Sequence, residues 1–338
     1  MTHATAAPVQ RSSALDLFKT LLVVGMVSIH VFQLLGRSLP GWMDRVSEGV
    51  NLITFSGFLL ALGIGVGLSR NRARSWPERL VPVAMLLGAC WLSSLAFAML
   101  VDRLPLTTTL AIDILTLRKL FGWSEFLASF FALYLLMALA RPILIRMATD
   151  NLAFALSLGV AFLSTWVVLD AGLPGTATLI GTTRFASFPL IPYLPWFLIG
   201  IRIGRASGEV SPWLWLAAAL CSALFAWQLY QTGNLPGRFP PTALWIAGPA
   251  LILLAYWQLS RGLARPDIWP VLLTPGRYVL SFLLLSNLAI FAMRHQFGRP
   301  IISVEIWVLM SVVLLAAITA LRKAASLRLP SAKALARH

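Results

Sequence analysis

Long apolar runs alternate with short polar segments along the whole chain of 338 residues. The apolar runs lie at about 15–35, 50–69, 81–101, 124–145, 152–170, 188–201, 212–231, 242–260, 276–293 and 301–321. A helix needs about 20 apolar residues to cross the hydrocarbon core of a bilayer. Only helices and closed barrels cross lipid, and these runs are too long and continuous for barrel strands. The pattern therefore predicts an all-α, polytopic bundle with about ten crossings.

Composition places the chain in the membrane class. Hydrophobic residues make up 59% of it and charged residues only 12%, with a mean hydropathy of +0.82. The net charge of +15 is dispersed between the apolar runs, so orientation in a lipid bilayer explains it better than binding to nucleic acid. The two cysteines lie inside apolar runs and predict no disulfide framework. The sequence does not predict an oligomeric state.

The basic residues of the polar segments indicate an orientation. With ten crossings and the N-terminus inside, the inner segments hold 16 Lys and Arg residues and the outer segments nine. This excess predicts that both termini are cytoplasmic. We therefore expect one membrane domain over 1–338, with a cytoplasmic segment at 1–14 and a basic cytoplasmic tail at 322–338. The first apolar run has no small-residue cleavage site, so we expect it to be retained.

One histidine lies where an ionisable group is costly. His30 is inside the first apolar run, and Lys19 precedes it by eleven residues, which is about three helical turns. Both side chains therefore face the same way, with Asp16 within about 60° of them. Ionisable groups in hydrocarbon line cavities or find partners, so His30 is the first functional candidate. Its imidazole can take a proton from a hydroxyl and return it later.

Two interpretations of Lys19 and Asp16 remain open. Lys19 can extend toward the interface and pair with Asp16 one turn away. It can also hold a phosphorylated donor that enters from the cytoplasm. Packing alone would likewise explain His30, through a hydrogen bond to another helix.

Further candidates follow along the chain. Asn51 and Ser56 offer hydrogen bonds in the second run and are candidates for stabilising an oxyanion. Glu125 could orient His30 or bind a sugar, or it could lie at a solvated helix end. The basic side chains near the inner ends of the runs are either positive-inside charge or ligands for a nucleotide phosphate. They are Arg72, Arg74, Arg79 and Arg277. No spacing typical of a metal site is present.

Residues 15–82 resemble the acyltransferase-3 superfamily of integral-membrane acyltransferases. The family has a Leu-Asp-x-x-Arg element ten residues before a histidine, which is similar to Leu15–Lys19 followed by His30. A Gly-Val…Phe-x-x-Ser-Gly-Phe-Leu block is similar to Gly49–Leu59, and an Arg-x-x-Pro step to Arg79–Pro82. Lys19 stands where the family has arginine. A lysine keeps the positive charge but lacks the guanidinium group, which can donate two parallel hydrogen bonds to a phosphate or carboxylate.

Later stretches match two branches of the superfamily more loosely. Residues 114–142 look like a succinyltransferase branch that decorates glucans. Residues 188–205 look like bacterial relatives of heparan-glucosaminide acetyltransferase. The donor therefore stays open between acetyl-CoA and succinyl-CoA.

The resemblance implies an acyl-CoA-dependent O-acyltransferase with no metal. It implies acyl-CoA as co-substrate, a hydroxyl of an extracytoplasmic glycan or glycolipid as acceptor, and His30 as general base. Transfer could be direct or pass through an acyl-histidine. A bacterial inner membrane is the expected location. The alternatives are a transporter or flippase for a lipid-linked sugar, with His30 in a proton relay, and a non-catalytic membrane scaffold.

Overall fold

The structure is a computed structural model that describes residues 12–37, 39–69, 75–170, 175–264 and 270–328. Helices make up 76% of the described residues, which form no strand apart from an isolated bridge between Gly36 and Ile301. The helices are α1 (Ser13–Leu35), α2 (Trp42–Leu68), α3 (Trp76–Leu100), α4 (Thr108–Leu115), α5 (Ser124–Thr149), α6 (Asn151–Ser164), α7 (Thr176–Leu179), α8 (Leu190–Arg205), α9 (Pro212–Thr232), α10 (Ala243–Ala247), α11 (Ala250–Leu263), α12 (Thr274–Arg277), α13 (Val279–Phe297) and α14 (Val304–Arg328). The all-α prediction is confirmed.

Eight helical segments of the described chain are long and apolar enough to cross a membrane. They are α1, α2, α3, α5, α9, α10 with α11, α13 and α14. The number and composition of these helices indicate a multi-pass membrane protein. The two other predicted runs form shorter helices, α6 with 14 residues and α8 with 16. In the fifth run the helix ends at Ser164, short of the predicted residue 170, and in the sixth it begins only after Pro189.

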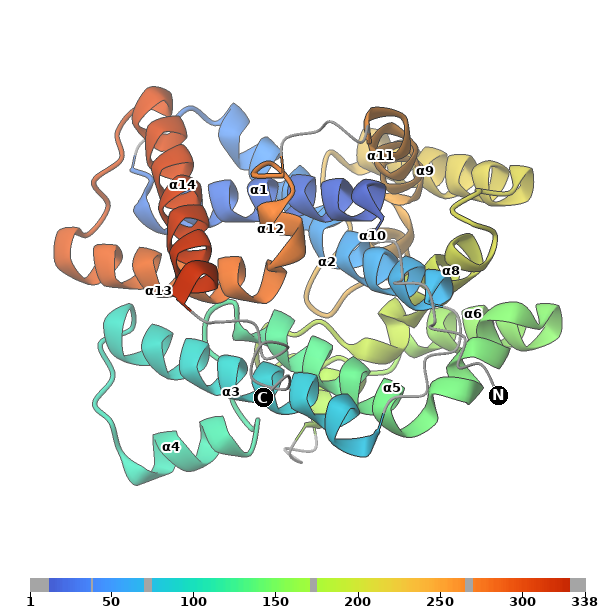
Figure 1. The fold of residues 1–338 in the computed structure, drawn as a ribbon, viewed down its shortest axis with the longest axis horizontal. Helices are drawn as coiled ribbons and strands as arrows, with labels where there is room; N and C mark the ends of the chain where they lie inside the picture. Colours follow the sequence, from blue (N-terminus) through green and yellow to red (C-terminus); the bar gives the residue numbers. More distant parts are fainter. Residues whose placement is uncertain (1–11, 38, 70–74, 171–174, 265–269, 329–338) are drawn as a thin grey trace, which may run out of the picture.

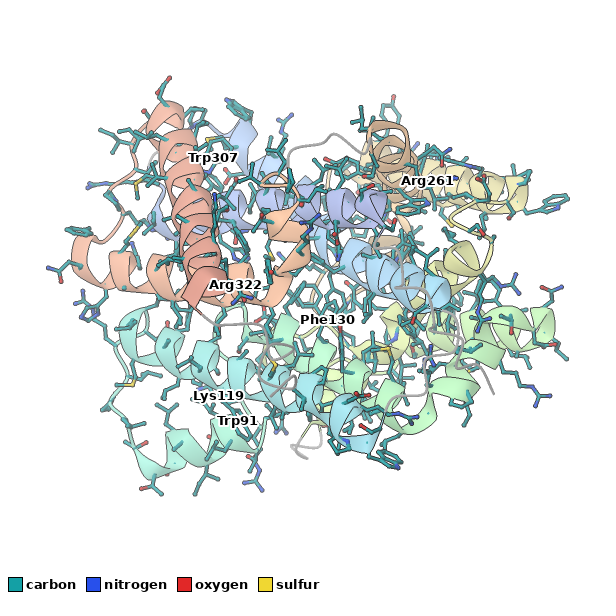
Figure 2. All side chains as sticks on the ribbon, in the orientation of Figure 1. Trp91, Lys119, Phe130, Arg261, Trp307 and Arg322 are labelled. Atoms are coloured by element: carbon teal, nitrogen blue, oxygen red, sulfur yellow. The ribbon has the colours of Figure 1, made fainter. Side chains whose placement is uncertain are left out.

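Helix α1 is surrounded by other helices and contacts α2, α11, α13 and α14 (Figure 1). Phe18, Val23 and Val27 on α1 are fully buried. Trp307 on α14 donates a hydrogen bond of 2.7 Å to the carbonyl oxygen of Ser28, which ties the two helices together (Figure 2). The first helix is therefore a buried element of the bundle, as its ionisable side chains require.

Glycines bring α2 and α8 into close contact. A Cβ atom added at Gly63 would overlap the carbonyl oxygen of Phe197, and one at Gly200 would overlap that of Leu60. Gly67 and Gly204 repeat the arrangement one turn further along. Small residues allow helix backbones to approach closely in lipid, where no hydrophobic effect drives them together. This crossing fixes the position of α2, which carries the polar residues of the second apolar run.

Helices α9 and α14 expose most of their surface. In the apolar 18-residue stretch of each helix, only 6% of α9 and 11% of α14 is buried inside the protein. Trp213, Leu220 and Trp227 on α9 are among the exposed apolar side chains. Such faces are costly in water and favourable in lipid, as expected for a bundle in a bilayer.

Candidate functional site

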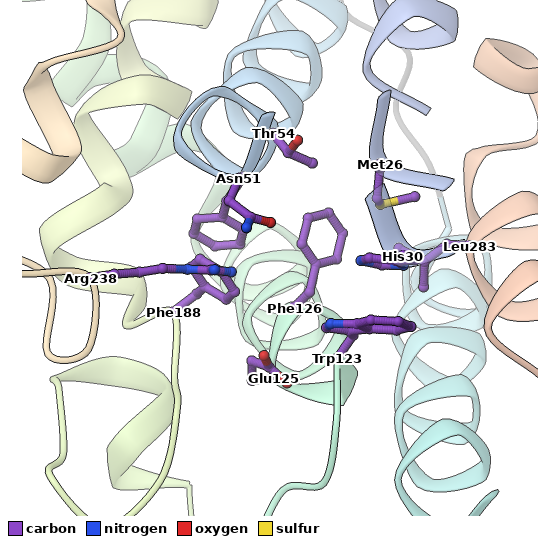
Figure 3. Close-up of a pocket in the computed structure, with 11 residues that line it drawn as sticks. Met26, His30, Asn51, Thr54, Trp123, Glu125, Phe126, Phe188, Arg238 and Leu283 are labelled. Carbon is purple, nitrogen blue, oxygen red and sulfur yellow. The ribbon is translucent and has the colours of Figure 1, made fainter. Parts of the chain in front are cut away.

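His30 lines a small cavity of about 30 Å³ between α1, α2 and the start of α5. We call it the histidine cavity. Figure 3 shows the parallel rings of His30 and Trp123 on one side of it and Arg238 reaching in from the other. The polar or amphipathic side chains that line it are His30, Asn51, Thr54, Trp123, Glu125 and Arg238. These residues come from four separate parts of the chain.

The imidazole of His30 is held on two sides. It is 7% exposed and stacks on Trp123, with ring centroids 3.5 Å apart and an angle of 4° between the planes. Its Nδ1 lies 2.9 Å from Oδ1 of Asn287 on α13. An amide oxygen only accepts hydrogen bonds, so Nδ1 carries the proton and the lone pair of the neutral ring is on Nε2. The ring is thus set up to accept a proton at Nε2.

Asn287 is expected to act as a positioning residue for His30. Asn287→Ala would leave the Nδ1–H donor buried without its partner, at a cost of about 1–3 kcal/mol, and would release the ring orientation. For a reaction in which His30 is the base, we expect the rate to fall about 10–100-fold. A pH–rate profile measures the shift in the apparent pKa that a purely structural defect would not cause. An unchanged rate and profile in the folded variant would contradict this role.

Glu125 is buried beside the histidine. It is 5% exposed and belongs to the first turn of α5, directly after Trp123 and Ser124. The solvated helix end that the sequence left open for Glu125 is therefore excluded. The same turn supplies both the stacking partner of His30 and a carboxyl group in the cavity. Asn51 lines the opposite wall, from α2.

Arg238 is a site residue that sequence reasoning missed. It comes from residues 233–242, which connect α9 to α10. Its guanidinium carbon lies 4.6 Å from the ring centroid of Phe239, 5.5 Å from that of Phe188 and 6.0 Å from that of Trp245. In the sequence it is an ordinary arginine between two apolar runs, and nothing signals that its loop turns inward.

A second, larger cavity of about 590 Å³ lies between α1, α2, α3, α5, α13 and α14. We call it the basic cavity because five cationic side chains line it. They are Lys19, Arg79, Arg141, Arg277 and Arg322. Most other lining residues are apolar, among them Phe58 and Leu86. Such a cavity suits a ligand with an anionic end and a long, largely apolar arm.

Asp16 organises two of these cations. Its carboxyl group is 2% exposed and lies 3.0 Å from Nζ of Lys19 and 3.2 Å from Nε of Arg277. The short α12 is docked on this turn, because the amide of Gly276 donates a 3.0 Å hydrogen bond to Thr20 Oγ1. A Cβ atom at Gly276 would overlap the carbonyl oxygen of Asp16. Asp16 thus fixes the two cations at the cavity wall.

The two cavities share wall residues. Phe126 and Leu283 line both of them. Phe126 belongs to an aromatic group, with centroids 5.5 Å from Phe55 and 4.8 Å from Phe130. The two cavities therefore adjoin at the side chains of Phe126 and Leu283.

Some of the remaining sequence candidates line a cavity and others do not. Arg79 and Arg277 line the basic cavity together with Lys19. Ser56 lines neither cavity, and its buried hydroxyl has no hydrogen-bond partner among the described residues. Arg72 and Arg74 lie outside the described residues, as do 1–11 and 329–338 of the two terminal segments. No group of three or more potential metal ligands is found in the described parts of the chain.

Comparison with known proteins gives no relative. No family model, no curated protein and no solved structure matches the chain.

Proposed function

We propose that the protein is a membrane-bound O-acyltransferase of the acyltransferase-3 superfamily. It would move an acetyl or succinyl group from cytoplasmic acyl-CoA to a hydroxyl of an extracytoplasmic glycan or glycolipid. The observation that carries this proposal is the pair of adjoining cavities on α1. One holds a buried histidine and the other holds five cations. The motif residues Lys19 and His30 each line one of them, which supports the resemblance of residues 15–82.

The basic cavity would bind the donor. Phosphates of the nucleotide would lie on its arginines and on Lys19, and the pantetheine arm would follow its apolar wall toward Phe126. In this proposal the basic cavity opens to the cytoplasm, both termini are cytoplasmic and α6 and α8 complete ten crossings. The membrane would be a bacterial inner membrane.

His30 would act as the general base. Nε2 takes the proton of the acceptor hydroxyl, and the hydroxyl oxygen attacks the thioester carbonyl carbon. The tetrahedral intermediate collapses, the C–S bond breaks, and the proton passes to the CoA thiolate. The amide of Asn51 would donate a hydrogen bond to the oxyanion, and Glu125 would accept one from the acceptor. The acyl-histidine route would use the same Nε2 as nucleophile.

Lys19→Gln is expected to weaken donor binding. Removal of one cation from the basic cavity lowers the attraction for a polyanionic nucleotide, so the Kd for CoA should rise about tenfold, with a smaller effect on kcat. Isothermal titration calorimetry on the purified protein measures the change. Lys119→Gln is the matched control, because Lys119 is exposed and lines neither cavity. Equal affinities of the wild-type protein and the Lys19 variant would contradict this role.

The decisive test of the proposed function is consumption of thioester. Purified protein with acetyl-CoA or succinyl-CoA and a glycoside acceptor should release free CoA thiol and form an ester. A flippase would instead move a lipid-linked sugar in response to a proton gradient without consuming acyl-CoA. Transport without thioester consumption would overturn the proposal.

A further inference from the structure

Arg238 presents an unsatisfied guanidinium to the histidine cavity. Its Nε is buried, and no hydrogen bond to the guanidinium is found among the described residues. The carboxylates whose charge acts on it are those of Glu125 and Glu48, but neither lies within 4.0 Å of it in the described structure. A buried N–H group without an acceptor is costly. The Nε–H group of Arg238 is therefore available to an acceptor supplied by a ligand.

Aromatic rings lie beside the guanidinium group of Arg238. Phe239 and Phe188 contact the guanidinium through their rings, at 4.6 and 5.5 Å. Such cation–π contacts hold the arginine without using its N–H groups. The donors stay available for a carboxylate or phosphate, which arginine binds through two parallel hydrogen bonds.

The volume of the cavity limits what part of a substrate can enter it. About 30 Å³ is room for about two water molecules. A sugar ring is far too large for this space. The terminal carboxylate of a short acyl chain takes up about the volume of two water molecules, and the rest of the chain would reach in from the basic cavity when wall side chains such as Phe126 rotate. His30 and Arg238 line the same cavity from different sides, so such a chain can have its thioester carbon at the histidine and its anion at the arginine (Figure 3).

Resting on the proposed function, we propose that Arg238 binds the free carboxylate of a dicarboxylic acyl donor and so selects succinyl-CoA over acetyl-CoA. The C–S bond of the thioester breaks, the new C–O bond forms to the acceptor oxygen, and the hydroxyl proton ends on the CoA thiol by way of His30. The free carboxylate is unchanged and stays paired with Arg238 throughout. Arg238 is thus a specificity-determining residue, contributed by a loop rather than by a membrane helix.

The test compares donors. We would measure kcat/KM for CoA release from succinyl-CoA and from acetyl-CoA, with methyl glucoside as acceptor, using the purified full chain. Arg238→Gln removes the charge, Arg238→Lys keeps it without the fork, and Arg45→Gln removes an exposed arginine that lines neither cavity. Thermal unfolding of each variant reports whether it is folded.

The wild-type protein should prefer succinyl-CoA by about 30-fold or more, which corresponds to the loss of one partner of a buried, hydrogen-bonded charge pair. Arg238→Gln should abolish this preference, with kcat/KM for succinyl-CoA falling about 30-fold more than kcat/KM for acetyl-CoA. Arg238→Lys should restore part of it, and Arg45→Gln should behave like the wild-type protein.

Three results would overturn the proposal. The first is equal use of both donors by the wild-type protein. The second is an equal loss with both donors in Arg238→Gln. The third is an Arg238-dependent preference for methyl glucuronide over methyl glucoside with acetyl-CoA, which would assign the carboxylate to the acceptor. If neither thioester is bound or consumed, the proposed function itself fails. Equal activity with both thioesters would instead contradict only the role of Arg238.

Discussion

His30→Ala is expected to lower the rate of acyl transfer by roughly 10²–10⁴-fold, the usual contribution of a general base. The imidazole is buried against Trp123, and its hydrogen bond to Asn287 leaves Nε2 as the basic atom. The affinity for CoA should stay within about twofold of the wild-type value, because His30 does not line the basic cavity. Steady-state CoA release and calorimetry on the same preparation separate the two effects.

His295→Ala is the matched control. His295 is exposed near the end of α13, and its Nδ1 lies 3.0 Å from the carbonyl oxygen of Leu100. This variant should keep wild-type activity. Wild-type transfer by purified His30→Ala would show that the base is another residue.

Gly63→Leu is expected to prevent stable packing of α2 against α8. A Cβ atom at position 63 would overlap the carbonyl oxygen of Phe197 and approach Gly200 Cα. Backbone atoms cannot rotate away as the end of a side chain does, so the two helices must separate. Overpacking of this kind costs roughly 3 kcal/mol or more. We expect a fall of more than about 5 °C in the unfolding temperature in detergent and loss of the histidine cavity.

Gly88→Ala is the control for a glycine that lies outside the α2–α8 crossing. Gly88 lies on an exposed face of α3, and a Cβ atom there would meet no other atom within 4 Å. This variant should unfold at or above the wild-type temperature, since alanine is the better helix former. Equal unfolding temperatures for Gly63→Leu and Gly88→Ala would show that the α2–α8 crossing is not as close as described.

The apolar pattern is sufficient to predict the long apolar helices, because each crossing needs a run of about 20 residues. The short helices α4 and α7 lie outside the predicted runs. All ten predicted runs contain helix. The ends of several helices were not predictable. Helix α6 ends at Ser164 within a run that continues to residue 170, and α2 begins at Trp42, before the predicted run that starts at residue 50. Apolar composition alone does not fix where a helix ends.

The relative placement of the candidate site residues was predictable only where they share a helix. The spacing of Asp16, Lys19 and His30 follows from helical geometry. Asn287 is 257 residues from His30, and Arg238 belongs to a connecting loop. Such contacts depend on how helices pack across the bundle, and a single sequence carries no signal for them. Glu125 was an open candidate until the packing of α5 placed it in the cavity.

The central claim is that an acyl group from a cytoplasmic thioester reaches position 30. His30→Cys, in sealed vesicles with acyl-CoA confined to the side of the basic cavity, tests it by mass spectrometry. Thiol exchange should place the acyl group on the introduced thiol and release CoA, whereas Ser56→Cys, buried outside both cavities, should stay unmodified. An unmodified thiol at position 30 in protein that binds the donor would contradict the account.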